Sequence, residues 1–103
     1  MSTEKMWIEE RDIVGVKLIA GEEAEAAAAV ISESYPDAVI ERYPAYLSIE
    51  APKEVVFDLR QISERLGRPY DAPTFLVIMS SYHGRINVDD DRITLSSEIV
   101  RPE

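Results

Sequence analysis

Residues 13–35 read IVGVKLIAGEEAEAAAAVISESY, and this stretch indicates the fold class of the chain. Apolar residues alternate along its first seven positions, as in a strand with one packed face, and those expected to be buried are Val14, Val16 and Leu18. Gly21 ends this strand, and residues 22–35 then predict a helix, because small and apolar residues recur at helical spacing. They are Ala24, Ala27, Ala28 and Ile31. The small side chains would let the helix lie close against a sheet.

Outward from this unit, short apolar runs separated by turn residues predict further strands. The expected strands are 38–43, 46–51, 55–57, 76–83, 85–88 and 92–95. A second helix is expected between Asp58 as its N-cap and Gly67 as its C′ residue, with Gln61 completing a capping box, and residues 71–74 predict one more helical turn. This order predicts an α+β fold, a compact sandwich of largely antiparallel sheet with two to three helices.

The 103 residues fit one compact domain. Residues 1–12 are charged and lack a clear period, so we expect a flexible N-terminal arm followed by a single domain over 13–103. Trp7 is the exception in the arm. It would either anchor the arm on the domain or contact a partner, since tryptophan is enriched at binding hot spots, and the sequence leaves both readings open.

The composition excludes several classes of function. The chain holds 11 basic and 20 acidic residues, for a net charge of −9, and this balance argues against binding to nucleic acid or to anionic membranes. The absence of cysteine excludes disulfides, Fe–S clusters and thiolate zinc sites. No apolar run approaches the length of a membrane span, and residues 1–10 lack the apolar core of a signal peptide. A cytoplasmic location is therefore expected.

The residues that could carry chemistry do not form a recognisable catalytic or metal-binding pattern. The run Asp89-Asp90-Asp91 lacks the spacing of a calcium loop, so it is interpreted as a solvated hairpin turn. No glutamate stands three residues before His83, the one histidine, so the Glu-x-x-His pairs of a di-iron carboxylate site are missing. The four glycines form no phosphate-binding motif. We therefore expect neither a cofactor nor a metal.

Residues 76–83 form the most strand-like segment, and their second half breaks the apolar pattern. Such a strand would place Met79, Ser81 and His83 on one face. Polar and small residues occupy the end of this strand and the positions after it, and this kind of local exception often marks a functional site. The candidate binding residues are Ser80, Ser81, Tyr82, His83, Gly84 and Arg85. The alternative is a strand that simply leaves the core.

Several segments in a fixed order resemble a known family. They are Leu66 to Asp71, Ser80 to Arg85, the acidic hairpin Asp89 to Leu95, Tyr35 to Ile40, Tyr43 to Tyr46 with Ile49, and Ser96 to Ile99. Together they resemble the effector proteins of bacterial soluble di-iron multicomponent monooxygenases, which are the regulatory or coupling subunits of phenol, toluene, alkene and methane monooxygenases. The resemblance covers about residues 13–99.

The resemblance implies an acidic, cytoplasmic α+β protein that has no prosthetic group and no catalytic residues. Its partner would be the di-iron hydroxylase, whose active site, substrate and oxygen access, and coupling of electron transfer to hydrocarbon oxidation it would tune. Competition with the reductase or ferredoxin is a further implication. The substrate would be aromatic or an alkene. The family match places Ser80, Ser81, Tyr82, Gly84 and Arg85 on the hydroxylase-facing surface, whereas His83 is not a family signature.

Two other functions stay open at this point. The first is a stand-alone small-ligand-binding module with a pocket lined by tyrosines and Met79. The second is a small hydrolase that uses Ser81 and His83, although no nucleophile elbow is present. For the effector, replacing Gly84 by tryptophan is expected to leave the fold intact and to block docking.

Overall fold

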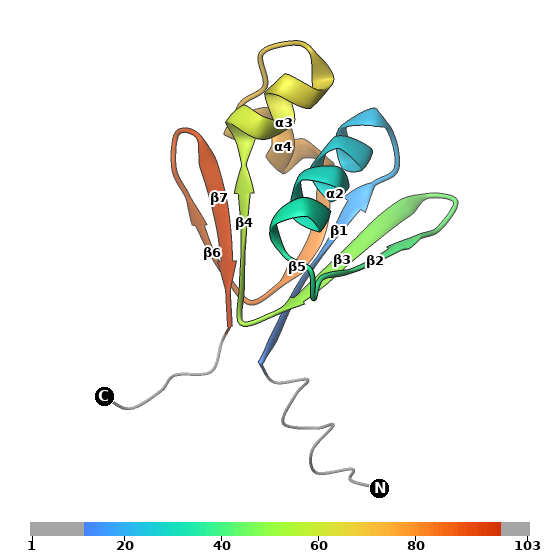
Figure 1. Ribbon diagram of the computed structural model, residues 1–103, viewed down its shortest axis with the longest axis vertical. Helices are drawn as coiled ribbons and strands as arrows, with labels where there is room; N and C mark the ends of the chain where they lie inside the picture. Colours follow the sequence, from blue (N-terminus) through green and yellow to red (C-terminus); the bar gives the residue numbers. More distant parts are fainter. Residues whose placement is uncertain (1–11, 98–103) are drawn as a thin grey trace, which may run out of the picture.

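The structure is a computed structural model that describes residues 12–97. Trp7, the rest of the expected arm before Asp12, and residues 98–103 lie outside the described residues. Within them the chain forms the following elements (Figure 1): β1 Ile13–Ile19, α2 Glu22–Ser34, β2 Val39–Arg42, β3 Tyr46–Pro52, β4 Glu54–Asp58, α3 Leu59–Leu66, α4 Ala72–Ile78, β5 Met79–His83, β6 Arg85–Val88 and β7 Arg92–Ser96.

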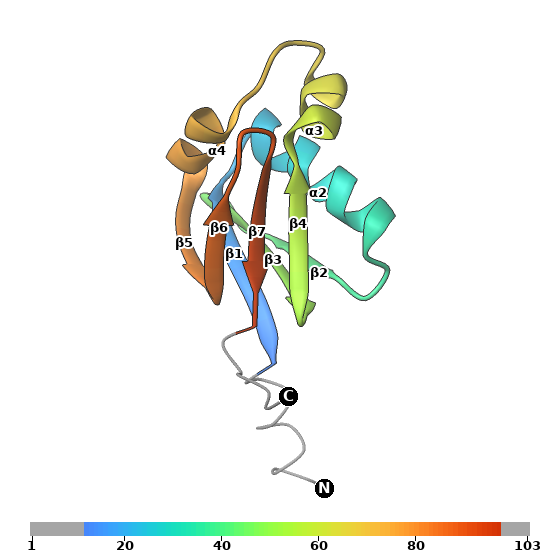
Figure 2. The same ribbon diagram turned by 90° about the vertical axis from the view of Figure 1, so that its left-hand side faces the viewer.

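The strands form two antiparallel sheets, which we name sheet A and sheet B. Sheet A has the order β2-β3-β1-β5, and sheet B has the order β4-β7-β6. The chain passes from sheet A to sheet B twice, at Lys53 between β3 and β4 and at Gly84 between β5 and β6. The two sheets spread apart toward the helices in Figure 1, and Figure 2 shows β5 and β6 at the same side of the molecule. The predicted α+β sandwich is confirmed.

Helix α2 packs against both sheets because its buried face is built from small residues. The buried residues are Ala24, Ala26, Ala27, Ala28, Val30 and Ile31. The helix contacts β3 of sheet A and β4 of sheet B. On its exposed side, Glu25 accepts hydrogen bonds from Nε and Nη2 of Arg42 on β2, at 2.8–3.1 Å. The predicted helix and its alanine face are confirmed.

Helix α3 begins and ends where the sequence predicts. The Asp58 carboxylate accepts hydrogen bonds from the backbone N–H groups of Arg60 and Gln61, at 3.0 and 3.3 Å, so the N-cap is confirmed. Gly67 ends the helix with a φ of 74°, the left-handed conformation that glycine adopts most easily. Leu59 and Ile62 are buried in the core below.

The expected strand over residues 76–83 is partly wrong, because residues 76–78 belong to helix α4. Asp71 caps this helix by accepting hydrogen bonds from the backbone N–H and the hydroxyl of Thr74, at 3.1 and 2.6 Å. The helix therefore extends well beyond the single turn expected at 71–74. It buries Phe75, whose ring lies 5.0 Å from that of Phe57 on β4. Only the second half of the expected segment is strand, as β5. No helix within residues 12–97 is long and apolar enough to span a membrane.

Candidate docking site

Strand β5 contains an irregularity in its pairing with β1, which changes the face of the sheet on which its first side chains lie. Lys17 pairs with Ser81, but the next residue of β1, Leu18, pairs with Met79. Ser80 is thus an extra residue, as in a β-bulge, and its hydroxyl donates to the carbonyl oxygen of Lys17 at 3.0 Å. Met79 therefore lies on the core side with Leu18, while Ser81 lies on the outer side. The predicted common face of Met79, Ser81 and His83 is wrong for this reason.

Gly84 carries the chain from sheet A to sheet B, and both its conformation and its surroundings require glycine. Its φ is 121°, a value that residues with a side chain rarely adopt. A Cβ atom here would lie 2.7 Å from the carbonyl oxygen of Ser96 and 3.2 Å from Cγ1 of Val14. The expectation that tryptophan at this position would leave the fold intact is therefore wrong.

Arg85 is the first residue of β6, and it differs from the other arginines in its lack of an ionic partner within residues 12–97. Among residues 12–97, the other five arginines each form an ion pair with a carboxylate, whereas no ion pair or hydrogen bond of the Arg85 side chain is present in that range. The residue is exposed and pairs along the backbone with Ser96. Its guanidinium is thus available to an external carboxylate.

The six candidate residues run along β5, Gly84 and the start of β6, and all except the half-buried Gly84 are exposed. Both strands are the outermost strands of their sheets (Figure 2). Tyr82 is 49% exposed although it lies opposite the buried Val16. Ser81 and His83 point to the outer side of sheet A, beside Lys17 and Gly15. We name residues Ser80–Arg85 the edge strip.

Ser81 and His83 share a face, as a hydrolase would require, but their surroundings do not supply a catalytic arrangement. In residues 12–97, no hydrogen bond links either side chain to the other or to a carboxylate. Both are exposed at the rim of sheet A. The general base of a serine nucleophile must be held in place by a third group, and the described residues offer none here.

Sequence reasoning missed the residues of β1 that border the edge strip. A shallow groove of about 120 Å³ is lined by Gly15, Val16, Lys17, Ser48, Glu50, Ser81, Tyr82 and His83. It joins the edge strip to the outer face of sheet A. The signal available in the sequence was Gly15 itself, since a glycine within a strand often marks a close approach by another chain or ligand.

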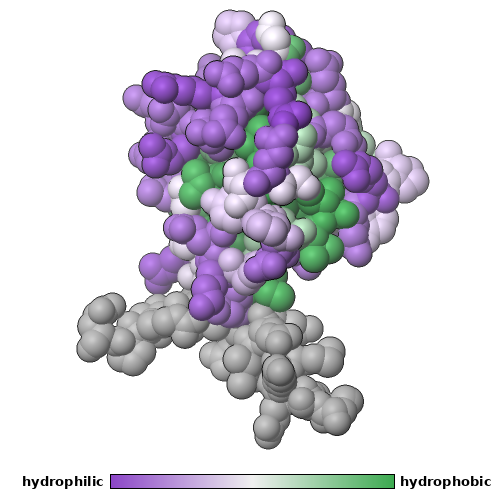
Figure 3. Space-filling view, viewed as in Figure 1, coloured by the Kyte–Doolittle hydropathy of each residue, from purple (hydrophilic) through white to green (hydrophobic). Residues whose placement is uncertain are grey.

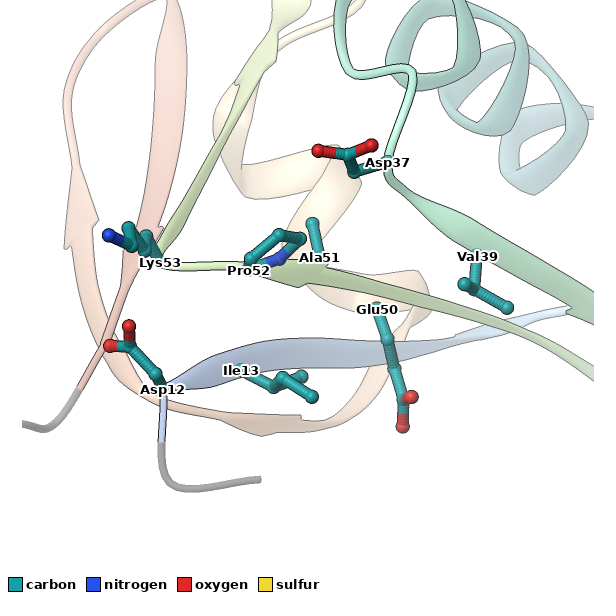
Figure 4. A pocket seen from close by; sticks show the side chains of 8 residues that line it. All are labelled: Asp12, Ile13, Asp37, Val39, Glu50, Ala51, Pro52 and Lys53. Carbon is teal, nitrogen blue, oxygen red and sulfur yellow. The ribbon is translucent and has the colours of Figure 1, made fainter. Parts of the chain in front are cut away.

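A second cavity, of about 450 Å³, lies where β1 begins, β3 ends and β2 begins (Figure 4), and it shares Glu50 with the groove. Its apolar lining consists of Ile13, Val39, Ala51 and Pro52, and Asp12, Asp37, Glu50 and Lys53 complete it. The ligand-binding alternative expected a pocket lined by tyrosines and Met79, and this cavity contains neither. Its lining comes from strand ends rather than from the edge strip.

Ionic contacts fix the exposed surface at the start of α2. Arg68 pairs with Glu22 and Glu23, at 3.0 and 3.5 Å. Tyr70 donates to Glu23 at 3.1 Å, and burial together with this hydrogen bond raises the pKa of the Tyr70 hydroxyl well above its ordinary value. These groups already have partners within the fold, so they stabilise the domain rather than offer a binding site.

The architecture and the edge strip define a class of small α+β domains in which the open edges of two antiparallel sheets lie together on one side. The sequence model of the MmoB/DmpM family matches residues 12–96, and the chain belongs to that family. One relative is the phenol 2-monooxygenase stimulatory component DmpM of Pseudomonas sp. (strain CF600). It is 35% identical over 65 residues, which cover 63% of this chain and 72% of that protein.

Solved structures show the same fold. A chain of a phenol hydroxylase–regulatory protein complex aligns with a TM-score of 0.73 and 28% identity, covering 82% of this chain and 97% of its own length. The soluble methane monooxygenase regulatory protein B aligns with a TM-score of 0.66 and 29% identity, covering 85% of this chain and 67% of that one. The family resemblance seen in the sequence is confirmed.

Proposed function

We propose that this chain is a cofactor-free effector that binds the di-iron hydroxylase of a multicomponent monooxygenase and increases its productive oxidation of substrate. Family membership supports this proposal, because the related proteins are stimulatory or regulatory components. The chain contributes no catalytic residue. It works in the cytoplasm, and aromatic compounds or alkenes are the proposed substrate class of the complex.

The edge strip is the observation that supports the proposed binding of this chain to the hydroxylase. Tyrosine and arginine are enriched at binding hot spots, and the strip presents a half-exposed Tyr82 close to Arg85. Arg85 has no ion pair to lose within the described fold, so pairing with a hydroxylase carboxylate breaks no internal contact. Gly84 between them makes the turn from sheet A to sheet B that brings both residues to the same side of the molecule.

The effector acts by binding one conformation of the hydroxylase better than the others. A ligand shifts such an equilibrium only by its difference in affinity for the two states. The reacting groups belong to the hydroxylase, and their repositioning changes substrate and oxygen access and the coupling of electron transfer. A reductase or ferredoxin that uses an overlapping part of the hydroxylase surface would compete with the effector.

The docking site is tested by charge reversal at two arginines. We expect Arg85→Glu to weaken binding to the purified hydroxylase about tenfold or more, as loss of an interface hot spot does. Arg60→Glu is the matched control, because its side chain is 81% exposed and lies on α3 with only a 3.9 Å contact to Asp91. Binding is measured by isothermal titration calorimetry, and stimulation by product formed.

A wild-type affinity for Arg85→Glu would remove Arg85 from the interface. Weakening of both variants by the same amount would mean that net charge, rather than a specific contact, governs binding. Tyr82→Ala provides an independent check at the same strip, since its half-exposed ring is not part of the core.

A stand-alone ligand-binding module remains a second candidate, and the cavity of about 450 Å³ favours it. This volume lies within the range of small-molecule sites, which are mostly apolar with a few polar groups. Phenol, toluene and 1-hexene, titrated into the isolated protein and followed by NMR chemical shifts of Ile13 and Val39, test this function. Saturable shifts in the absence of hydroxylase would support it, and their absence up to the solubility limit would exclude it for these ligands.

A further inference from the structure

The outer face of sheet A is uncovered within the described residues, although its inner face carries part of the core. The strand register places Gly15, Lys17 and Ile19 on the outer side, opposite Glu50, Ser48 and Tyr46. Two apolar residues on this face are exposed to solvent, Ile19 at 49% and Val39 at 54%. On the side of the molecule that carries α2, hydrophilic residues surround several smaller apolar areas (Figure 3). Lys17, Ser48 and Glu50 lie between these two exposed residues, so the face combines apolar with polar groups, as the surfaces of protein–protein interfaces commonly do.

Gly15 lies in the middle of this face, and its backbone does not require glycine. Its φ is not among the positive values in the described residues, and glycine inside a strand weakens that strand. A Cβ atom at Gly15 would meet Cγ of Glu50 at 3.3 Å, a side chain that is exposed and can move. What glycine provides here is the floor of the groove that leads to Ser81 and His83. The outer face is therefore continuous with the edge strip.

An ordered aromatic pair marks the far end of the same face. The rings of Tyr43 and Tyr46 stack with centroids 4.6 Å apart, and Nζ of Lys17 lies 5.6 Å from the centroid of the Tyr46 ring. The Tyr43 hydroxyl donates to Glu41 at 2.8 Å. These contacts hold the aromatic groups in place before any partner binds, which lowers the entropy cost of association.

The charges of the face indicate the chemistry of its partner. Glu41 and Glu50 lie on it, and the single cation among these positions, Lys17, already contacts Tyr46. Within residues 12–97 the Glu50 carboxylate has no hydrogen bond or ion pair. A basic side chain beside apolar ones would therefore complement this surface, whereas an acidic segment would be repelled.

We propose that the outer face of sheet A, centred on Gly15, is a second part of the hydroxylase-binding surface. It receives a projecting segment of the hydroxylase that carries apolar side chains and a basic residue opposite Glu50. The inference rests on the proposed effector function and extends it from the edge strip across β1, β3 and β2.

Three variants test this inference against wild-type protein in the same hydroxylase titration. Gly15→Thr fills the groove with a residue that strands favour, and Val39→Lys places a positive charge opposite Glu50, where it would repel a basic partner residue. Ser32→Lys is the control, since it adds the same charge at an exposed position of α2. We expect Kd to rise about tenfold or more for the first two and to stay within twofold for the control. Melting temperatures establish that each variant is folded.

The outcomes separate this inference from the function on which it rests. If wild-type protein neither binds nor stimulates the hydroxylase, the proposed function fails. If wild-type protein binds and Gly15→Thr and Val39→Lys bind equally well, the effector function stands and the outer face is not part of the interface. Sedimentation of the free protein provides the remaining check, because a dimer that Val39→Lys dissociates would mean that a second copy covers the face.

Discussion

Gly84 and Gly15 lie close together at the β1–β5 pair, but they meet different physical requirements. Gly84 has a left-handed φ and a backbone oxygen in the place of its missing Cβ atom. Gly15 has neither restriction, and the nearest atom to its missing Cβ belongs to the exposed side chain of Glu50. The two positions therefore distinguish a glycine that the fold needs from one that a binding surface uses.

Replacing each glycine by alanine should separate these roles. Gly84→Ala is expected to lower the free energy of unfolding by about 1–3 kcal/mol from backbone strain alone, with a further loss from the contact with Ser96. Gly15→Ala should change it by less than about 1 kcal/mol, because its backbone conformation suits any residue. Urea unfolding measures both. An equal effect of the two substitutions would contradict the different roles assigned to them.

At the scale of elements, acidic pH should weaken two parts of the fold. One is the contact between α2 and β2, and the other is the capped first turn of α4. Hydrogen bonds from Arg42 lower the pKa of Glu25 below its ordinary value, and hydrogen bonds from Thr74 lower that of Asp71. A carboxyl group whose pKa is lowered in the folded state stabilises the fold. This stabilisation is complete at pH values above the pKa that the group has in the unfolded chain. This stabilisation is lost as the pH falls through the folded value.

We therefore expect the melting temperature to fall as the pH drops from about 5 toward 3, the range in which ordinary carboxyl groups titrate. Glu25→Gln and Asp71→Asn should each make this decrease shallower. Glu64→Gln, on the exposed side of α3 and without an ion pair in the described residues, is the control. A pH profile unchanged by the first two variants would show that these contacts do not govern acid stability.

Helix α4 also connects the core to β5, through Phe75. Its ring packs against Phe57 of sheet B and lies 6.4 Å from the ring of Tyr70. Phe75→Ala should destabilise the domain by about 3–5 kcal/mol, because it leaves a cavity among buried groups. Urea unfolding measures this loss. A decrease below about 1 kcal/mol would mean that α4 is not anchored by Phe75.

Most elements were predictable because a single physical signal marks each one. Alternation marked β1, alanine spacing marked α2, and Asp58 with Gly67 marked the two ends of α3. Residues 76–78 were assigned to a strand because a short apolar run fits a strand and a buried helix equally well. The bulge at Ser80 depends on pairing with Lys17, a residue more than sixty positions away, so local sequence carried no sign of it.

The candidate site was predictable in part for the same reason. The polar end of β5 was visible because it interrupts an apolar run, and family resemblance pointed to it as well. The outer face of sheet A was not visible, since it is assembled from strands that are distant in sequence. The packing of α2 against one side of sheet A determines that the other face of its strands stays uncovered.

At the scale of the whole molecule, the distribution of charge argues against a metal requirement. The carboxylate of Asp91 in the acidic turn lies 3.9 Å from Nε of Arg60 and 3.8 Å from Nε of Arg92, and these cations oppose binding of a metal ion. EDTA should therefore leave the melting temperature unchanged. A decrease that added Ca²⁺ or Zn²⁺ reverses would show that a metal stabilises the fold.

The central claim is that this protein raises the activity of a hydroxylase. The direct measurement adds increasing amounts of it to purified hydroxylase and reductase from the same source, and follows oxidised product and reductant consumed. The account predicts that turnover, or product formed per reductant consumed, rises and saturates as the hydroxylase becomes occupied. No response at any ratio, with a hydroxylase shown to be competent by another route, would contradict it.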